Sequence, residues 1–537
     1  MRSIVLASTV AFALFGMRGA FAHDEDADQR VAASQARLGK VHFTNSCDSA
    51  VAKYFDVSIA LLHSFWVKDA IEGFNAVLKQ DPGCAIAYWG IAMSLQQNPL
   101  TGQEPNAPAV QLALAGLDKA KAIGAKTQRE RDYLTAIDNI YRDADKIPFR
   151  ARRLAYEKAM QALSQRYSED TEAEIFYALS LDMTADLTDK TYANQLKAAA
   201  ILERLSKTQP EHPGILHYLI HSYDYPAIAD RGVDAARRYA QVAPGHPHAL
   251  HMPSHIFTRL GTWQDSIDTN LRSAAAAKVE GNGQEQAHAM DYLVHAYLQM
   301  GRDAEARRVV TESQAIDTIN PAIFIGPYGV AAMPARYALE RRSWKEAAAL
   351  EPRESRFPFT MAITHFARGL GFARTGDTAS AQKEAAKLAT LRDALKEQKN
   401  TYWANQVEVQ RLAVAGWIAL AQGAQAEALA SMRASADLED SMEKHIVTPS
   451  PVVPARELLG DMLLETKRPA EALAAYESSA QREPNRLRGL YGAVQAAALS
   501  GDRAKAKVYY ERLAALTAHA DKGRLEPRQA RAYLAQR

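Results

Sequence analysis

The chain is 537 residues long, which is too long for one compact core and suits several domains or an extended repeat array. Hydrophobic residues make up 47% and charged residues 23%, which are ordinary values for a soluble globular protein. Lysine and arginine total 64 against 62 aspartate and glutamate, and no basic cluster stands out. Phosphate binding needs a basic surplus on some face, so we expect no nucleic acid partner.

The N-terminus has the pattern of a secretory signal peptide. Arg2 precedes an apolar run over 4–15, and Ala20-Phe21-Ala22 is a small-x-small cleavage site ahead of an acidic stretch. We expect residues 1–22 to be removed and residues 23–45 to form an N-terminal tail. No later apolar stretch is long enough to span a bilayer, so the sequence predicts a periplasmic or secreted protein with no membrane span after cleavage.

Cys47 and Cys84 are the two cysteines of the chain and flank the first expected helical hairpin. In an oxidising compartment they are placed to form a disulfide that fastens the N-terminal end of the array. Two unpaired thiols are the equally weighted alternative.

Apolar stretches of helical period follow one another along the chain, separated by short Gly or Asp-Pro turns. Tetratricopeptide (TPR) spacing is visible in Ala70, Phe74, Val77 and Pro82, and again in Leu459, Gly460, Ala472, Tyr476 and Pro484. The sequence therefore predicts an all-α, TPR-like, right-handed α-solenoid of helical hairpins. We divide it into N-terminal helical repeats (46–200), central histidine-rich repeats (201–310), degenerate helical repeats (311–450) and C-terminal TPR repeats with a tail (451–537).

Three segments, 81–90, 217–221 and 251–256, resemble those of a family of secreted bacterial TPR-repeat proteins. The resemblance implies this architecture and compartment, and it implies no settled biochemical role.

The central repeats copy histidines at a spacing of 34 residues. His212, Pro213, His217 and His221 are matched by His246, Pro247, His251 and His255. Each copy carries H-x-x-x-H, and side chains four apart lie on one face of a helix. The same register places Asp291 and His295 in a third copy.

Counted in the TPR register, nine side chains fall on positions that line the concave groove: His217, His221, Asp224, His248, His251, His255, His288, Asp291 and His295. Imidazole and carboxylate groups are ligands for Zn, Cu(II), Ni or non-haem Fe. Because a metal ion takes three or four protein ligands, the surplus is expected to orient the ligands or to form a second site. The stripe of His217, His221 and Asp224 is the most compact candidate.

Other interpretations remain open at this stage. Pro253 breaks or begins a helix between His251 and His255, so the two need not share a face. His212 and His246 precede prolines and are expected at the rim. The zinc-protease pattern H-E-x-x-H is absent, so the sequence does not decide between a metal carrier and a metalloenzyme. The alternative function is a scaffold that holds a periplasmic protein or peptide in the groove without metal.

Overall fold

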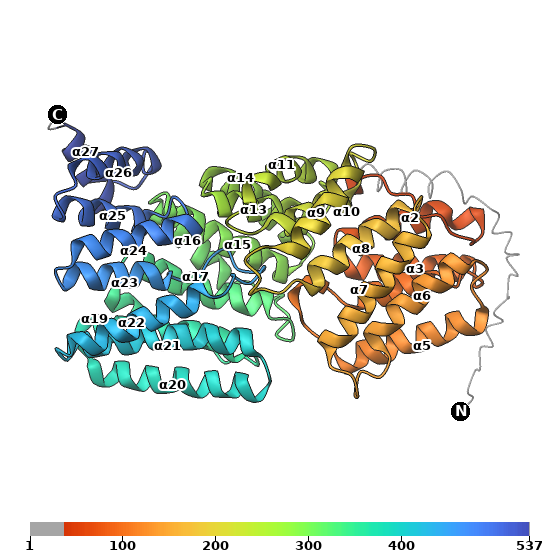
Figure 1. Cartoon of the computed structure of the whole chain (residues 1–537), viewed down its shortest axis with the longest axis horizontal. Helices are drawn as coiled ribbons and strands as arrows, with labels where there is room; N and C mark the ends of the chain where they lie inside the picture. The colour runs from red at the N-terminus through yellow and green to blue at the C-terminus, as the bar shows by residue number, and fades with distance from the viewer. Residues whose placement is uncertain (1–36, 536–537) are drawn as a thin grey trace, which may run out of the picture.

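The computed structural model describes residues 37–535, and in that range it contains helices and no strand. Most helices pair with the next one along the chain to form hairpins, and neighbouring hairpins stack (Figure 1). The predicted all-α solenoid of helical hairpins is confirmed. The expected signal peptide, residues 1–22, lies outside the described residues. No helix between 37 and 535 combines the length and the apolar character needed to cross a bilayer.

The first half of the array contains α2 to α11. Its helices are α2 (Ala52–His63), α3 (Val67–Gln80), α4 (Ala87–Leu95), α5 (Ala107–Ile123), α6 (Gln128–Tyr141), α7 (Phe149–Arg166), α8 (Thr171–Thr184), α9 (Ala193–Ser206), α10 (Pro213–Tyr223) and α11 (Val233–Val242). Local signals set several of the boundaries. At the start of α6, for example, Thr127 and Glu130 form a capping box that satisfies free backbone N–H groups.

The second half contains α12 to α27. Its helices are α12 (Pro247–His251), α13 (Pro253–Leu260), α14 (Trp263–Val279), α15 (Gly283–Gln299), α16 (Asp303–Ser313), α17 (Ile325–Glu340), α18 (Trp344–Ala348), α19 (Pro358–Thr375), α20 (Thr378–Glu397), α21 (Thr401–Ala421), α22 (Gln425–Asp440), α23 (Ala455–Glu465), α24 (Pro469–Arg482), α25 (Leu487–Leu499), α26 (Arg503–Leu516) and α27 (Leu525–Ala535). Short 3-10 turns lie at Ser49–Val51, Pro99–Thr101 and Ala229–Gly232.

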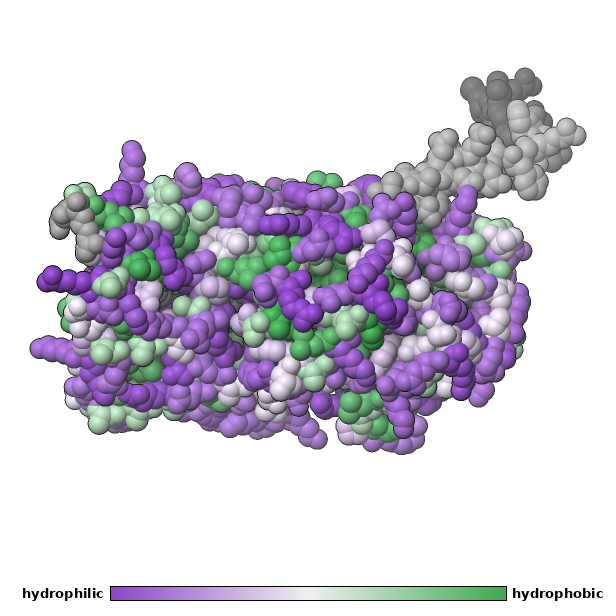
Figure 2. Space-filling model, turned by 45° about the horizontal axis from the view of Figure 1, so that its top comes forward, coloured by the Kyte–Doolittle hydropathy of each residue, from purple (hydrophilic) through white to green (hydrophobic). Residues whose placement is uncertain are grey.

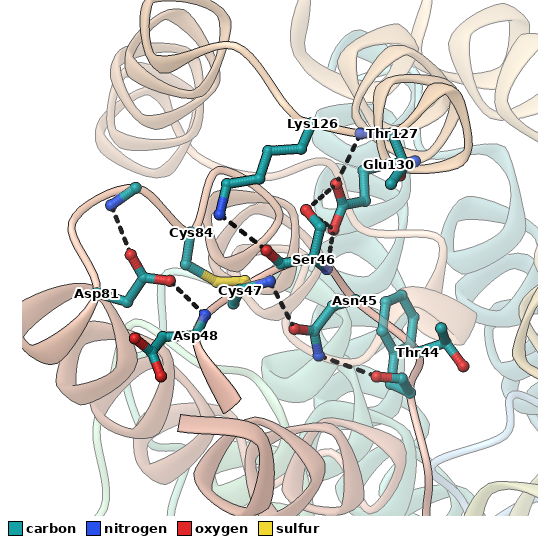
Figure 3. The surroundings of a disulfide bond; sticks show 12 residues. Thr44, Asn45, Ser46, Cys47, Asp48, Asp81, Cys84, Lys126, Thr127 and Glu130 are labelled. Carbon is teal, nitrogen blue, oxygen red and sulfur yellow. Dashed lines mark hydrogen bonds between the residues drawn. A yellow bond between two sulfur atoms is a disulfide. The ribbon is translucent and has the colours of Figure 1, made fainter. Parts of the chain in front are cut away.

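Cys47 and Cys84 form a disulfide, which settles the alternative that the sequence left open. The bond joins the segment before α2 to the turn after α3 (Figure 3). Around it, the backbone N–H and hydroxyl of Ser46 donate to the Glu130 carboxylate, and Lys126 donates to the Ser46 carbonyl. The N-terminal segment is thereby fastened to α6 as well as to α3.

The superhelix curls until its C-terminal repeats lie against the central ones (Figure 1). The indole of Trp263 donates to the Asn485 carbonyl at 2.8 Å, and the Leu487 N–H donates to the Gln299 side chain at 3.0 Å. Gly261 shows how close the approach is. A Cβ at this position would lie 2.6 Å from the Pro484 carbonyl oxygen, and the residue has φ +66°, so only glycine fits.

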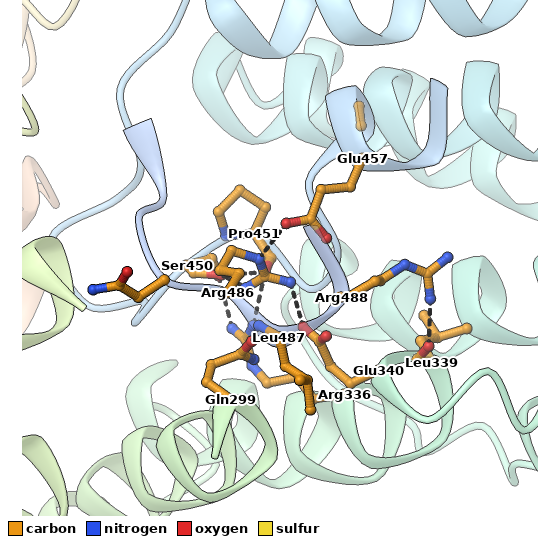
Figure 4. Close-up of polar contacts among 12 residues, drawn as sticks. Gln299, Arg336, Leu339, Glu340, Ser450, Pro451, Glu457, Arg486, Leu487 and Arg488 are labelled. Carbon is orange, nitrogen blue, oxygen red and sulfur yellow. Dashed lines mark hydrogen bonds and ion pairs between the residues drawn. The ribbon is translucent and has the colours of Figure 1, made fainter. Parts of the chain in front are cut away.

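The irregular segment 441–454, between α22 and α23, enters the space that this curl encloses. Loops normally lie on the surface because a buried backbone must find hydrogen-bond partners. Here arginines provide them. Arg336 donates to the carbonyls of Ser450 and Pro451 (Figure 4). Arg482 donates to the carbonyl of Met442. We call residues 441–454 the inner segment.

Arg486 is the buried cation that joins the inner segment to the surrounding helices. Its guanidinium is 1% exposed and contacts the carboxylates of Glu457 and Glu340 and the hydroxyl of Ser450 (Figure 4). The face drawn in Figure 2 is mainly hydrophilic, with small apolar areas among the polar ones.

Replacing Arg486 by Met tests this closure. The variant leaves two buried carboxylates without their cation, so the free energy of unfolding should fall by about 3–5 kcal/mol in urea denaturation. Arg433→Met is the matched control, because Arg433 pairs with Glu471 at the surface with both side chains more than 40% exposed. It should change stability by less than about 1 kcal/mol. Equal effects of the two substitutions would contradict the role given to Arg486.

Candidate metal centre

Three consecutive repeats place their histidines on neighbouring helices. His217 and His221 are on α10, His248 and His251 on α12, His255 on α13 and His288 on α15. Contacts join α10 to α13 and α12 to α15. All six histidine residues are at most 7% exposed, so they lie in the interior of the array and do not line an open groove. We call this group of six side chains the histidine chamber.

Two sets of three imidazoles converge in this chamber. The first triad is His217, His221 and His248, and the second is His251, His255 and His288. Within each triad the candidate ligand atoms lie within 4.8 Å of one another. The two triads are adjacent, since the ring centroids of His221 and His255 are 5.8 Å apart.

The nitrogen spacings match those of a coordinated ion. His217 Nε2 lies 3.1 Å from His221 Nε2 and 3.3 Å from His248 Nε2. In the second triad, the Nε2 atoms of His251 and His255 are 3.1 Å apart. Two imidazoles bound to a tetrahedral Zn²⁺ at about 2.0–2.1 Å place their nitrogens about 3.3 Å apart.

Hydrogen bonds on the far side of the rings fix which nitrogen carries the proton. His217 Nδ1 lies 2.7 Å from the His63 carbonyl, which can only accept. His255 Nδ1 lies 2.9 Å from the Asp224 carboxylate. His251 Nδ1 lies 2.6 Å from Asn270 Oδ1, and the Asn270 amide donates to the Ser266 carbonyl, which sets its orientation. All three rings therefore carry the proton on Nδ1 and a lone pair on Nε2.

The second triad thus contains two lone pairs that face each other. Since Nδ1 of both His251 and His255 is a donor, neither neutral ring has a proton to give across the 3.1 Å between the Nε2 atoms. Burial lowers the pKa of His255 and lowers that of His251 well below its usual range, so protonation is disfavoured. A cation between the two nitrogens satisfies both.

Three of the nine predicted residues lie outside the triads. Asp224 is not beside His217 and His221 but behind His255, where its oxygens also contact Arg259 at 2.8 Å and Lys444 at 3.2 Å. Asp291 forms a buried ion pair with Arg336 at 2.9 Å. His295 is fully buried with both ring nitrogens unpartnered, and its ring packs against Trp263. The carboxylate of Asp224 thus fixes the orientation of the His255 ring.

Pro253 does not separate His251 from His255. α12 ends at His251 and α13 begins at Pro253, but Met252 between them keeps a helical backbone and the two imidazoles still meet. The expected rim residues are buried instead: the side chains of His212 and His246 accept from backbone N–H groups at the starts of α10 and α12. His212 also shares the buried carboxylate of Glu172 with His63, at 2.8 and 2.9 Å.

Sequence reasoning missed four polar residues that support the chamber. Asn270 and the His63 carbonyl orient rings of the triads, Glu285 lies 3.5 Å from His248 Nδ1, and Lys444 reaches Asp224 from the inner segment. Asn270 and Glu285 lie in the central repeats but outside the H-x-x-x-H segments, so the histidine pattern does not indicate them. Lys444 is 220 residues from Asp224 in sequence, and no pattern indicates that pairing.

The sequence matches no protein-family model and no curated protein. Among solved structures, the chain is similar to a human IFIT1 dimer with m7Gppp-AAAA, at 14% identity and a TM-score of 0.37, over 91% of this chain and all of that one. A human IFIT1 dimer with PPP-AAAA gives 13% identity and a TM-score of 0.38 over the same shares. Similarity at this level carries no conclusion about ligands or function.

Burial of the imidazoles predicts how stability depends on pH. The pKa values of His217, His221, His251 and His288 are lowered well below their usual range by burial. A histidine that is neutral in the fold regains a pKa of about 6.5 in the unfolded chain, so unfolding below that pH takes up a proton. Its contribution to stability is therefore complete above about pH 6.5 and is lost as pH falls below it, by about 1.4 kcal/mol per pH unit for each residue.

Urea unfolding of metal-free protein at pH 7.5, 6.5 and 5.5 measures this slope. The double variant His217→Gln/His221→Gln should have a shallower slope than the unmodified chain. The double variant His42→Gln/His519→Gln should keep the full slope, because both residues are exposed. Stability that does not change down to pH 5.5 would be inconsistent with neutral buried imidazoles.

Proposed function

We propose that this protein binds two transition-metal ions, one in each histidine triad. The observation that carries the proposal is the pair of Nε2 lone pairs of His251 and His255, which face each other at 3.1 Å while both Nδ1 protons are engaged elsewhere. An unsatisfied polar atom is costly in a buried interior, and two of them at ligand spacing favour a bound cation. The first triad has the same kind of spacing and a ring with a fixed tautomer, His217.

The donor set limits the choice of metal. Six imidazoles suit Zn, Cu(II), Ni or Fe, and the thiolates that favour other ions are unavailable because both cysteines are in the disulfide. Three protein ligands leave one tetrahedral position open in each triad, which is typical of catalytic zinc sites rather than structural ones. We therefore assign the ions to binding an exchangeable water or substrate, which fits a metalloenzyme better than a sealed structural site.

The alternative, a scaffold that binds a protein or peptide in the groove, has less support at these positions. Such a scaffold needs solvated, spread-out side chains along its concave face. The nine predicted groove residues are instead at most 7% exposed, and Lys444 of the inner segment contacts Asp224 among them. A peptide would have to displace this segment to reach the histidines.

We also propose that the protein is exported. The support is the signal-like pattern of residues 1–22 together with the Cys47–Cys84 disulfide, since disulfides persist in oxidising compartments. Mass spectrometry of the protein from a native host should find a mature chain that begins at His23. An intact Met1 on the exported chain would contradict the proposal.

Metal content of untagged protein tests the central proposal. Elemental analysis after exposure to Zn²⁺ or Cu²⁺ should find two ions per chain, with dissociation constants at or below about 1 μM. The variant His251→Ala/His255→Ala should keep about one ion, because it loses two ligands of the second triad and none of the first. His42→Ala/His519→Ala removes the same number of imidazoles outside the chamber and should retain both ions.

The competing result is equally clear. If the unmodified chain takes up no ion at this affinity, or if the chamber variant binds as much metal as the control variant, the triads do not hold metal.

A further inference from the structure

Tyr292 is a buried residue whose hydroxyl the protein leaves without a hydrogen-bond partner. The residue is 1% exposed, and no donor or acceptor of the chain bonds to its Oη. Buried polar atoms in proteins are almost always paired. The Tyr292 hydroxyl therefore requires a partner that the chain itself does not supply.

The ring of Tyr292 packs against the whole second triad. Its centroid lies 4.6 Å from that of His251 and 5.4 Å from those of His255 and His288. His288 and Tyr292 are four residues apart on α15, so they share one face of that helix. The unpartnered hydroxyl is thus carried by a ring that contacts all three candidate ligands of one ion.

The hydroxyl does not bond to the imidazoles themselves. A phenol is protonated at neutral pH and can donate, and Nε2 of His251 and Nε2 of His255 each have a lone pair. Neither nitrogen is a hydrogen-bond partner of Tyr292 Oη. In the proposed centre these lone pairs bind the ion, and three imidazoles leave one tetrahedral position open. An atom bound to the ion at that position can accept from Tyr292, which no atom of the triad does.

The charge balance of the chamber favours an anion at the open position. Among the described residues, Asp224 and Glu285 are the carboxylates that contact triad imidazoles. Asp224 is already in contact with two cations, Arg259 and Lys444. The charge of two divalent ions held by neutral imidazoles is therefore largely uncompensated, which is costly in a buried site. An anion bound to an ion offsets part of that charge.

We infer that the ion of the second triad binds a small oxyanion, which coordinates the ion through one oxygen and accepts a hydrogen bond from Tyr292. The inference rests on the proposed function, because it needs an ion in the second triad, and it names the class of ligand. The ligand is small because the six histidine residues of the chamber are at most 7% exposed. Inorganic oxyanions and the carboxylate of a small organic acid share this chemistry.

Titration of the copper-loaded chain with formate and formamide tests the inference. The two probes have nearly the same size and shape, and formate alone is an anion. Formate should change the visible and electron paramagnetic resonance spectra of bound Cu²⁺ with a dissociation constant at or below about 1 mM, and formamide should bind at least about tenfold more weakly. A parallel titration with inorganic phosphate separates the two sources: tighter binding of phosphate identifies an inorganic oxyanion, and tighter binding of formate identifies a carboxylate.

Substitution of Tyr292 makes the test specific to the hydroxyl. Tyr292→Phe should keep both ions and bind formate about tenfold more weakly, because a hydrogen bond to a charged group is lost. Tyr297→Phe is the matched control, because Tyr297 is also on α15 and 2% exposed, but its ring contacts Arg302. It should bind formate like the unmodified chain, and circular dichroism should show both variants folded.

A chain that binds two ions but no formate up to about 10 mM, or that binds formate and formamide equally, would overturn this inference and leave the proposed function intact. So would a Tyr292→Phe variant that binds formate like Tyr297→Phe. A phenolate-to-copper charge-transfer band that is lost in Tyr292→Phe would also contradict the inference, since Tyr292 would then be a ligand of the ion. A chain that takes up no ion would contradict the proposed function and this inference together.

Discussion

Two unprotonated imidazole nitrogens held 3.1 Å apart in a buried interior are the constraint on which the rest of the centre depends. Lone pairs at that distance repel unless a cation lies between them, and desolvation makes protonation an expensive way to supply it. The surrounding residues keep the rings in this arrangement. Asn270 and Asp224 hold the Nδ1 protons of His251 and His255, and Arg259 and Lys444 balance the charge of Asp224. Each outer contact thus fixes a tautomer or an orientation of a candidate ligand.

The solenoid places the histidines side by side, and its closure buries them. Stacked hairpins bring equivalent positions of successive repeats side by side, so one histidine pattern copied at a fixed spacing becomes a cluster. An open TPR groove would leave that cluster solvated. In this chain the C-terminal repeats return to the central ones, and the inner segment fills the groove between them. Buried Arg336 and Arg486 donate hydrogen bonds to that segment and hold it in place. They therefore contribute to the chamber without contacting its histidines.

Local sequence patterns predict the parts of this arrangement that depend on residues close together in the chain. Hydrophobic period and TPR spacing indicated the hairpins, and the 34-residue repeat of H-x-x-x-H indicated which histidines share helix faces. Contacts between side chains on different helices are harder to predict. Asp224 follows His221 by about one helical turn, so the sequence groups the two, but α10 ends at Tyr223 and the Asp224 side chain turns toward α13 and His255. The burial of the chamber was not predictable, because the inner segment reaches Asp224 from 220 residues away and its length and sequence carry no signal for that contact.

The most direct test of the account is anomalous X-ray diffraction from crystals of the untagged chain grown with Zn²⁺, with data collected on both sides of the zinc absorption edge. Two anomalous peaks are expected in the interior, each about 2.0–2.1 Å from three imidazole nitrogens. One peak should be bounded by His217, His221 and His248, and the other by His251, His255 and His288. An interior without anomalous density, with zinc found only on exposed residues such as His42 or His519, would contradict it.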